Sequence, residues 1–282
     1  MTLHSRRTLL KLACILSPAR MTGLPRGLWR FKEPDGQKVS PPIPDTFPAQ
    51  PTELVREMVT VSHFDLKRVR ELVTLHPSLA RASWDWGFGD WESALGAAGH
   101  MGNRAIAEYL IANGARPSLF SAAMLGQFEV VKAFVGAQPG VQQIRGPHGI
   151  SLLAHAKAGG DGARAVFEYL QSLGDADAEP TVAIKETEAA ALAGTYTFGI
   201  GANQQIEVTL EQRQGVALMY SPLTWTRKGI MGRPLVHAGD RTFYPAGAPA
   251  VRIRFAEENG AMVMTVSDPE VVLTAWRRPA TR

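Results

Sequence analysis

The stretch from Ser93 to Pro117, SALGAAGHMGNRAIAEYLIANGARP, contains two short helical patterns separated by a glycine. Small alanines dominate the first half, whereas Ile106 and Leu110 recur at helical spacing in the second. Gly102 lies between them, and glycine adopts positive φ angles without steric cost. The stretch therefore predicts two helices joined by a tight turn, with small alanines that let helices of adjacent units approach closely.

The same plan returns elsewhere in the chain, which indicates an internal repeat. AEYL at 107–110 recurs as FEYL at 167–170, and each is followed by a Gly and an Ala. Between them, AAMLGQFEVVKAF at 122–134 has the same organisation, and FDLKRVRELV at 64–73 matches its second half. We therefore predict about four two-helix units over residues 52–178, the outer ones degenerate.

These residues resemble ankyrin repeats, whose consensus reads Thr-Pro-Leu-His-x-Ala, then a Gly turn, an apolar helix and Gly-Ala. Residues 93–117 are the clearest copy, and Ser151–Leu153 with Ala156 and Gly160 form a second. The interval from Gly102 to Gly126 is 24 residues, shorter than the repeat of about 33. The resemblance implies a stack with a concave face that holds another protein or peptide; the alternative is a generic helical bundle.

A second, β-rich domain is predicted for residues 191–282, after a connector at 179–190. Two-residue alternation begins near Leu192, and Asn259-Gly260 is a typical hairpin turn. About eight short strands imply an antiparallel barrel or sandwich. The expected strands are 194–198, 206–210, 216–220, 223–227, 241–244, 251–255, 262–266 and 271–276.

The β-rich segment resembles the small lipocalin-like domain that follows catalytic domains such as β-lactamase-like serine peptidases. The resemblance is carried by residues 192–196, 243–245, 253–255 and 273–278. The catalytic domain of those proteins has no counterpart, and Ser-x-x-Lys, Gly-x-Ser-x-Gly, His-Glu-x-x-His and the phosphate-binding Gly-x-x-x-x-Gly-Lys are absent from the sequence. We therefore expect no enzymatic activity.

The N-terminal segment, SRRTLLK at 5–11, resembles the bacterial twin-arginine export motif. It implies a leader over residues 1–30 and a periplasmic location. The alternative is a basic arm on a cytoplasmic protein. Residues 31–51 are rich in proline and are expected to form an extended linker.

The composition excludes several classes of function. The 282 residues are 45% hydrophobic and carry a formal charge of +4, but residues 1–30 contribute six positive charges and no acid. The rest of the chain is therefore mildly acidic, which argues against binding of a nucleic-acid backbone. No apolar run approaches the roughly 18 to 20 residues of a spanning helix. The single cysteine, Cys14, excludes an internal disulfide and a Cys-based zinc site.

The densest unusual segment is WDWGFGDWE at 84–92. Exposed aromatic rings beside carboxylates are typical of a binding surface for a peptide, a basic partner or a sugar ring, and the alternative is a cap on the helical stack. We expect Trp91 to be structural and Trp84 or Trp86 to be exposed. The candidate partner-binding residues are Trp84, Asp85, Trp86, Phe88, Asp90, Trp91 and Glu92.

Other polar residues give weaker signals. His148 and His155 are seven residues apart, but Gly149 argues against one helix carrying both, so we expect no metal site and no cofactor there. Arg252, Arg254, Arg277 and Arg278 form either an anion pocket or solvated strand faces. The sequence thus predicts an α + β multidomain protein, an ankyrin-like stack followed by a barrel or sandwich. The expected function is non-enzymatic binding of a protein or peptide; the alternative is a small-ligand pocket inside the β domain.

Overall fold

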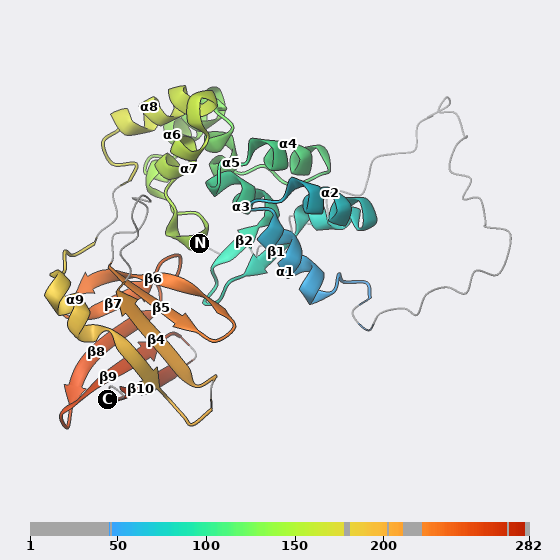
Figure 1. Ribbon diagram of the computed structural model, residues 1–282. Coiled ribbons are helices and arrows are strands. Elements are labelled where there is room, and N and C mark those ends of the chain that lie inside the picture. The colour runs from blue at the N-terminus through green and yellow to red at the C-terminus, as the bar shows by residue number, and fades with distance from the viewer. Residues whose placement is uncertain are drawn as a thin grey trace, which may run out of the picture. The chain divides into compact units, whose positions relative to one another are not determined.

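The computed structural model describes residues 45, 47–177, 181–201, 203–210, 222–269 and 271–279. The chain divides into two units, Met1–Phe47 and Pro48–Arg282, and every described helix and strand belongs to the second. Helices come first along the chain and a β barrel follows (Figure 1). The predicted leader, most of the proline-rich segment and the expected strand 216–220 lie outside the described residues.

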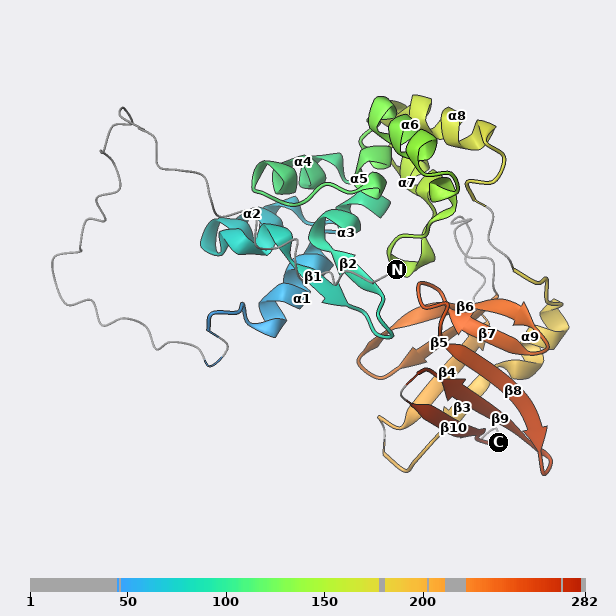
Figure 2. The same ribbon diagram turned by 180° about the vertical axis from the view of Figure 1, so that it is seen from behind.

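The helical part consists of paired helices joined by short turns (Figure 2). The first helix of each pair packs against the first helix of the next pair. The first helix of the second pair also contacts the first helix of the fourth. The pairs are α1 (Thr52–Val61) and α2 (Leu66–Leu75), α3 (Ala94–His100) and α4 (Arg104–Ala112), α5 (Leu119–Met124) and α6 (Phe128–Ala137), and α7 (Leu152–Ala158) and α8 (Arg164–Ser172).

In three of the helix pairs, a serine side chain caps the N-terminus of the first helix. The Oγ atoms of Ser93, Ser118 and Ser151 accept hydrogen bonds of 2.9, 3.2 and 3.1 Å from backbone N–H groups three residues further on. Such caps satisfy N–H groups that have no partner inside the helix. The same residue type at the same place explains why α3, α5 and α7 begin in the same way.

Two glycines make the close approach of different helix pairs possible. Gly102 and Gly126 have φ angles of +71° and +75°, in the left-handed region that favours glycine. A Cβ atom at Gly102 would lie 2.2 Å from the carbonyl oxygen of Ala158, and one at Gly126 would lie 1.9 Å from that of Gly162. Both turns therefore require the absence of a side chain as well as the unusual φ.

Short elements connect the helix pairs. A two-stranded antiparallel ribbon of β1 (Ser83–Asp85) and β2 (Trp91–Ser93) precedes α3. The 3₁₀ turns are η1 (Pro77–Arg81), η2 (Val141–Gln143), η3 (Pro147–Gly149) and η4 (Gly160–Ala163). Among the described residues, no helix has both the length and the apolar character needed to cross a bilayer.

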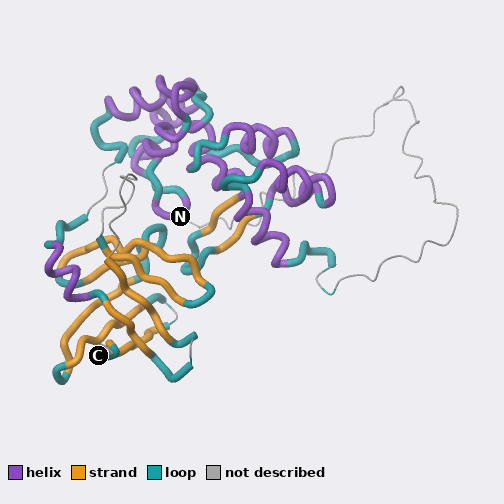
Figure 3. Tube along the Cα trace, viewed as in Figure 1, coloured by secondary structure: helices purple, strands orange, loops and turns teal. Residues whose placement is uncertain are grey.

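The second half of the chain forms a closed barrel of eight antiparallel strands (Figure 3). The barrel alternative of the sequence analysis is confirmed. The strand order is β10-β3-β4-β5-β6-β7-β8-β9, so each strand pairs with its neighbours in the chain and β10 closes onto β3. The strands are β3 (Gly194–Thr197), β4 (Gln205–Leu210), β5 (Leu223–Arg227), β6 (Ile230–Gly239), β7 (Thr242–Pro245), β8 (Arg252–Glu258), β9 (Ala261–Ser267) and β10 (Val272–Arg277).

Two elements of this half differ from the expectation. The sequence analysis missed β6, the longest strand, because Gly232, Pro234 and Gly239 interrupt its alternating pattern. A short helix, α9 (Glu186–Leu192), occupies the end of the segment expected to be a connector.

Large side chains fill the interior of the barrel. Tyr196, Phe243 and Phe255 are fully or almost fully buried. The ring of Phe255 packs edge to face against those of Tyr196 and Phe243, with ring centroids 5.5 and 5.6 Å apart. The hydroxyl of Tyr196 donates a 2.7 Å hydrogen bond to the carbonyl oxygen of Leu192 at the end of α9. An eight-stranded barrel is just wide enough for side chains to fill it, and here the aromatic rings form its core.

Candidate functional site

The aromatic segment 84–92 is a hairpin between β1 and β2. The register pairs Trp84 with Glu92 and Asp85 with Trp91. Gly87, Phe88 and Gly89 all have positive φ angles, and Oδ1 of Asp85 accepts a 2.8 Å hydrogen bond from the N–H of Gly87. Phe88 is not glycine, so its φ of +56° is strained backbone, and such strain is concentrated at functional sites. We call residues 84–92 the aromatic loop.

The exposure of the tryptophans is the reverse of the expectation. Trp91 is 64% exposed, whereas Trp84 and Trp86 are partly buried against the core of the first helix pairs. The prediction that Trp91 is structural and that Trp84 or Trp86 is exposed is therefore wrong. Strand alternation gives the physical reason, because the neighbouring Glu92 points into the protein and Trp91 must then point out.

The acidic residues of the aromatic loop also differ in burial. Asp85 is partly buried, whereas Asp90 and Glu92 are buried, with 3% and 0% exposure. A buried carboxylate must be paired or hydrogen-bonded to remain charged. Both buried acids meet this requirement, and their partners are mainly histidines.

Three histidine side chains converge on Glu92. His63 from the α1–α2 turn, His100 from the end of α3 and His148 from η3 each bring a ring nitrogen to its carboxylate. The four potential ligand atoms all lie within 4.8 Å of one another. We call His63, Glu92, His100 and His148 the histidine cluster.

The atoms of the cluster form a defined pattern. Oε1 of Glu92 lies 2.9 Å from Nε2 of His100. Oε2 lies 3.5 Å from Nε2 of His63 and 3.4 Å from Nε2 of His148, and it accepts a 2.7 Å hydrogen bond from Nε1 of Trp86. The aromatic loop thus supplies both the central carboxylate and the indole that orients it.

Burial and neighbouring charges shift the pKa values of Glu92, His148 and His63 in different directions. Burial alone would raise the pKa of Glu92, but the imidazoles of His100 and His148 outweigh it and hold that pKa well below its usual range. Burial alone would lower the pKa of His148, but the carboxylates of Asp90 and Glu92 raise it to about 9. For His63, burial is the largest effect and lowers the pKa.

Asp90 links the cluster to the barrel. Its Oδ1 accepts a 2.9 Å hydrogen bond from the backbone N–H of His148, and its Oδ2 lies 2.9 Å from the ring Nδ1. Oδ2 also accepts a 2.9 Å hydrogen bond from Nη2 of Arg233 in β6. Gly247 leaves room for this carboxylate, because a Cβ atom there would lie 2.7 Å from Oδ1.

A hollow of about 190 Å³ lies beside the aromatic loop. Phe88 stacks on Trp225 of β5 with ring centroids 5.7 Å apart. Nη1 of Arg233 is buried and has no hydrogen-bond partner among the described residues. The hollow combines aromatic surface with cationic groups, and it is lined by Trp86, Gly87, Phe88, Trp225, Thr226, Arg227, Ile230 and Arg233.

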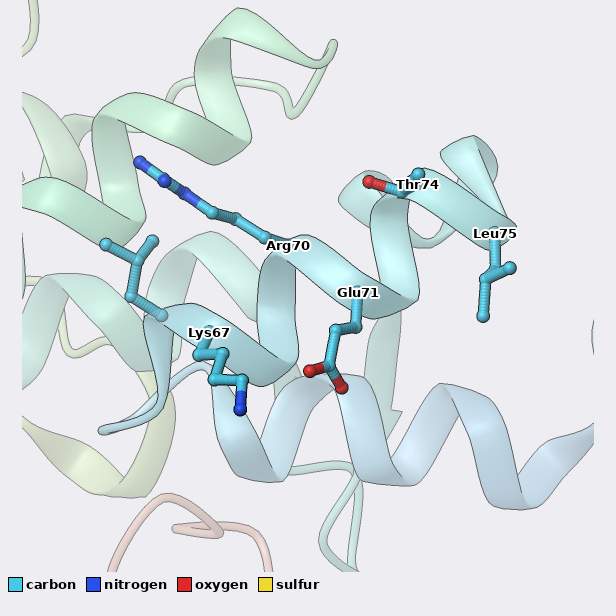
Figure 4. Close-up of a pocket in the computed structure, with 6 residues that line it drawn as sticks. Lys67, Arg70, Glu71, Thr74 and Leu75 are labelled. Atoms are coloured by element: carbon cyan, nitrogen blue, oxygen red, sulfur yellow. The ribbon is translucent and has the colours of Figure 1, made fainter.

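A wider hollow of about 830 Å³ lies along the surface of α2 (Figure 4). All the residues that line it belong to this one helix, and the labelled side chains diverge from the helix rather than converge on a point. A surface with one wall cannot surround a ligand. The lining residues are Leu66, Lys67, Arg70, Glu71, Thr74 and Leu75.

Of the four arginines, Arg277 and Arg278 line a hollow of about 580 Å³ together with Glu207, whereas Arg252 and Arg254 do not line it. Nη1 of Arg252 donates a hydrogen bond to the carbonyl oxygen of Val251, and Nη1 of Arg277 donates one to that of Ala191. Arg254 and Arg278 are exposed. This arrangement favours solvated strand faces over an anion pocket.

The sequence analysis missed most of the histidine cluster. It assigned Glu92 to a partner surface, compared His148 with His155, and did not single out His63 or His100. His155 is buried, and its Nδ1 is bonded to the carbonyl oxygen of Ser151. One sequence feature could have linked Glu92 with His148. Each lies shortly before a serine that caps the first helix of a pair, and the packing of first helices against one another brings these positions together.

Comparisons with protein-family models, with curated proteins and with solved structures found no match for the chain.

Proposed function

We propose that the chain is a non-enzymatic binding protein in which an ankyrin-type helical stack presents the aromatic loop to a protein or peptide. The observation that carries this proposal is the hollow beside the loop, where Phe88 stacks on Trp225 at its edge. Phe88 and Trp91 of the aromatic loop are 39% and 64% exposed. Aromatic residues of this kind dominate the energy of binding surfaces.

The ankyrin assignment rests on features shared by the helix pairs. First helices pack in succession, serines cap three of them, and glycines with positive φ follow at the turns. Ankyrin arrays have the same features, and their usual role is to hold another protein.

The chemistry of the hollow indicates the kind of partner. The rings of Trp86, Phe88 and Trp225 suit an apolar side chain, and the exposed guanidinium of Arg227 suits a carboxylate. We therefore expect a peptide segment with an apolar residue next to Asp or Glu. The lipocalin-like barrel contributes one wall of the hollow, and its filled interior argues against the small-ligand alternative.

The N-terminal motif supports a location for this activity. Ser5 to Lys11 fit the twin-arginine pattern, so we propose export to the periplasm and expect the partner there.

Selection of a random peptide library on the full-length protein tests the proposal. Enriched peptides should contain an apolar residue beside an acid, and Phe88→Ala should weaken their binding about 30-fold, as expected for a hot spot of roughly 2 kcal/mol. Phe134→Ala is the matched control, because Phe134 is 48% exposed on α6, outside the lining of the hollow. Failure to enrich any sequence, or equal losses for the two variants, would contradict the proposal.

A further inference from the structure

We propose that His63, Glu92, His100 and His148 bind one divalent transition-metal ion, with Zn²⁺ as the expected occupant. The site lies within the helical part of the chain and does not depend on the proposed peptide binding.

The distances suit ligands around a common ion. In a tetrahedral site with metal–ligand bonds of about 2.0 to 2.1 Å, neighbouring ligand atoms are about 3.3 to 3.5 Å apart. Oε2 of Glu92 is 3.5 Å from Nε2 of His63 and 3.4 Å from Nε2 of His148. These separations are long for hydrogen bonds, but they equal the edges of such a tetrahedron.

The ring nitrogens of His63 and His148 are oriented as in metal sites. Nδ1 of His63 lies 3.1 and 3.0 Å from the carbonyl oxygens of Val59 and Thr60, which can only accept, so it carries the proton. In the neutral ring, Nε2 of His63 then presents its lone pair to Glu92. Nδ1 of His148 faces Asp90 in the same manner, and its Nε2 is buried with no hydrogen-bond partner among the described residues.

This arrangement matches the supporting contacts of zinc-bound imidazoles. Such rings usually donate their other N–H to a carboxylate or a backbone carbonyl, and ligating carboxylates are themselves hydrogen-bonded. Asp90 supports His148, backbone carbonyls support His63, and the indole of Trp86 donates to Glu92.

The backbone positions the ligands at a cost. His148 has a φ of +59°, a strained value for a residue other than glycine, and it lies between Pro147 and Gly149. The side chain of Asn103 donates a hydrogen bond to the carbonyl oxygen of His63 and fixes the α1–α2 turn. Ligands from four separate elements therefore converge through contacts that hold each of them individually.

The ligand set identifies the class of ion. Three imidazole nitrogens and one carboxylate oxygen suit Zn²⁺, whereas Mg²⁺ and Ca²⁺ prefer oxygen ligands throughout. Four protein ligands close the coordination sphere, which is typical of structural rather than catalytic zinc. The side chains of Glu92 and His100 are 0% and 8% exposed, so the ion would be largely enclosed and would hold the aromatic loop to the helix pairs.

Metal analysis of the full-length protein tests this inference. After treatment with a chelator and dialysis, the protein should take up one equivalent of Zn²⁺, release protons on binding and melt at a higher temperature. Mg²⁺ and Ca²⁺ should have no such effect. Co²⁺ should give the intense visible absorption of a four-coordinate ion, and Zn²⁺ should abolish it. The Co²⁺ spectrum requires only the wild-type chain.

Variants then assign the ligands. His63→Gln, His100→Asn and His148→Asn should each weaken Zn²⁺ binding at least 100-fold, and Asp90→Asn about 10-fold to 100-fold through His148. His76→Asn is the matched control, since His76 is a partly buried histidine outside the cluster, and it should bind like wild type. Circular dichroism without metal identifies any variant that fails to fold.

The inference is overturned if wild type takes up much less than one equivalent of Zn²⁺, or if its Co²⁺ complex has the weak spectrum of a six-coordinate ion. Folded His63→Gln and His148→Asn variants with wild-type affinity would also overturn it. Peptide binding is measured separately, so a failure here is distinguishable from a failure of the proposed function.

Discussion

Oδ2 of Asp90 and Nη2 of Arg233 lie 2.9 Å apart in a buried ion pair, although 143 residues separate them in sequence. Asp90 belongs to the aromatic loop and Arg233 to β6 of the barrel. The same carboxylate oxygen is 2.9 Å from Nδ1 of His148. One side chain therefore connects the hollow beside the aromatic loop to the histidine cluster.

Breaking the Asp90–Arg233 pair should destabilise the fold strongly. Asp90→Ala leaves the buried guanidinium of Arg233 without its carboxylate, and Arg233→Met leaves the buried Asp90 with His148 as its remaining partner. The loss of a partner from a buried ion pair costs about 3 to 5 kcal/mol. Denaturant unfolding measures the loss in the free energy of unfolding. The double variant should lose less than the sum of the losses of the two single variants. Arg68→Met, which removes an exposed pair with Glu57, should leave the midpoint unchanged. Strictly additive losses would show that the pair is not coupled.

The tryptophans of the aromatic loop should differ in their effect on stability. Trp91→Ala should change the free energy of unfolding by no more than about 0.5 kcal/mol, because its ring is mostly exposed. Trp86→Ala should cost about 2 to 3 kcal/mol, since the indole packs on the core and donates to Glu92. Thermal melts of both variants compare the two losses of stability. A larger loss for Trp91→Ala would contradict the orientation of β2.

The glycine turns offer a test of the stacking of helix pairs. Gly114→Ala should cost only the strain of a positive φ, about 1 to 2 kcal/mol, because nothing lies within 4 Å of its Cβ position. Gly126→Ala should cost more, since its Cβ would lie 1.9 Å from the carbonyl oxygen of Gly162. Denaturant unfolding compares the two variants. Equal losses would mean that the α5–α6 turn does not pack against Gly162.

Tyr196 should make the barrel sensitive to high pH. Burial raises the pKa of Tyr196 to about 12, although the nearby charge of Arg277 acts in the opposite direction. The unfolded chain releases this proton near pH 10, so stability is present below pH 10 and is lost as the pH rises from 10 to about 12.

Tyr196→Phe separates this effect from other alkaline changes. At pH 8 the variant should be less stable by about 1 kcal/mol, because it lacks the hydrogen bond to Leu192. The difference should shrink between pH 10 and 12, since phenylalanine cannot ionise. Denaturant unfolding at pH 8 and 11 measures the difference, and a constant value would contradict the shifted pKa.

Export should depend on the arginine pair. Replacing Arg6 and Arg7 by lysine should leave the precursor in the cytoplasm of a bacterial host, because the twin-arginine receptor reads that pair. Cell fractionation with a Sec-exported protein as control measures the distribution. A cytoplasmic location for both wild type and variant would contradict the periplasmic assignment.

Local patterns accounted for much of the fold. The glycine between two apolar helical runs at 93–117 predicted a helix pair, and α3 and α4 lie there. Asn259-Gly260 predicted the hairpin between β8 and β9. These features depend on residues close in sequence, where steric preference and apolar spacing act directly. By contrast, β6 escaped detection, because its pairing with β5 and β7 outweighs the glycines and proline within it.

The sequence by itself thus predicted helices followed by an antiparallel barrel, and it singled out the aromatic loop through its composition. Only the tertiary structure decided that Trp91 faces outward and Glu92 inward, since strand direction depends on what lies behind the ribbon. Only the tertiary structure brought His63, Glu92, His100 and His148 within 4.8 Å of one another. Their separations along the chain follow no motif, because stacking of helix pairs, rather than spacing within one helix, places them together.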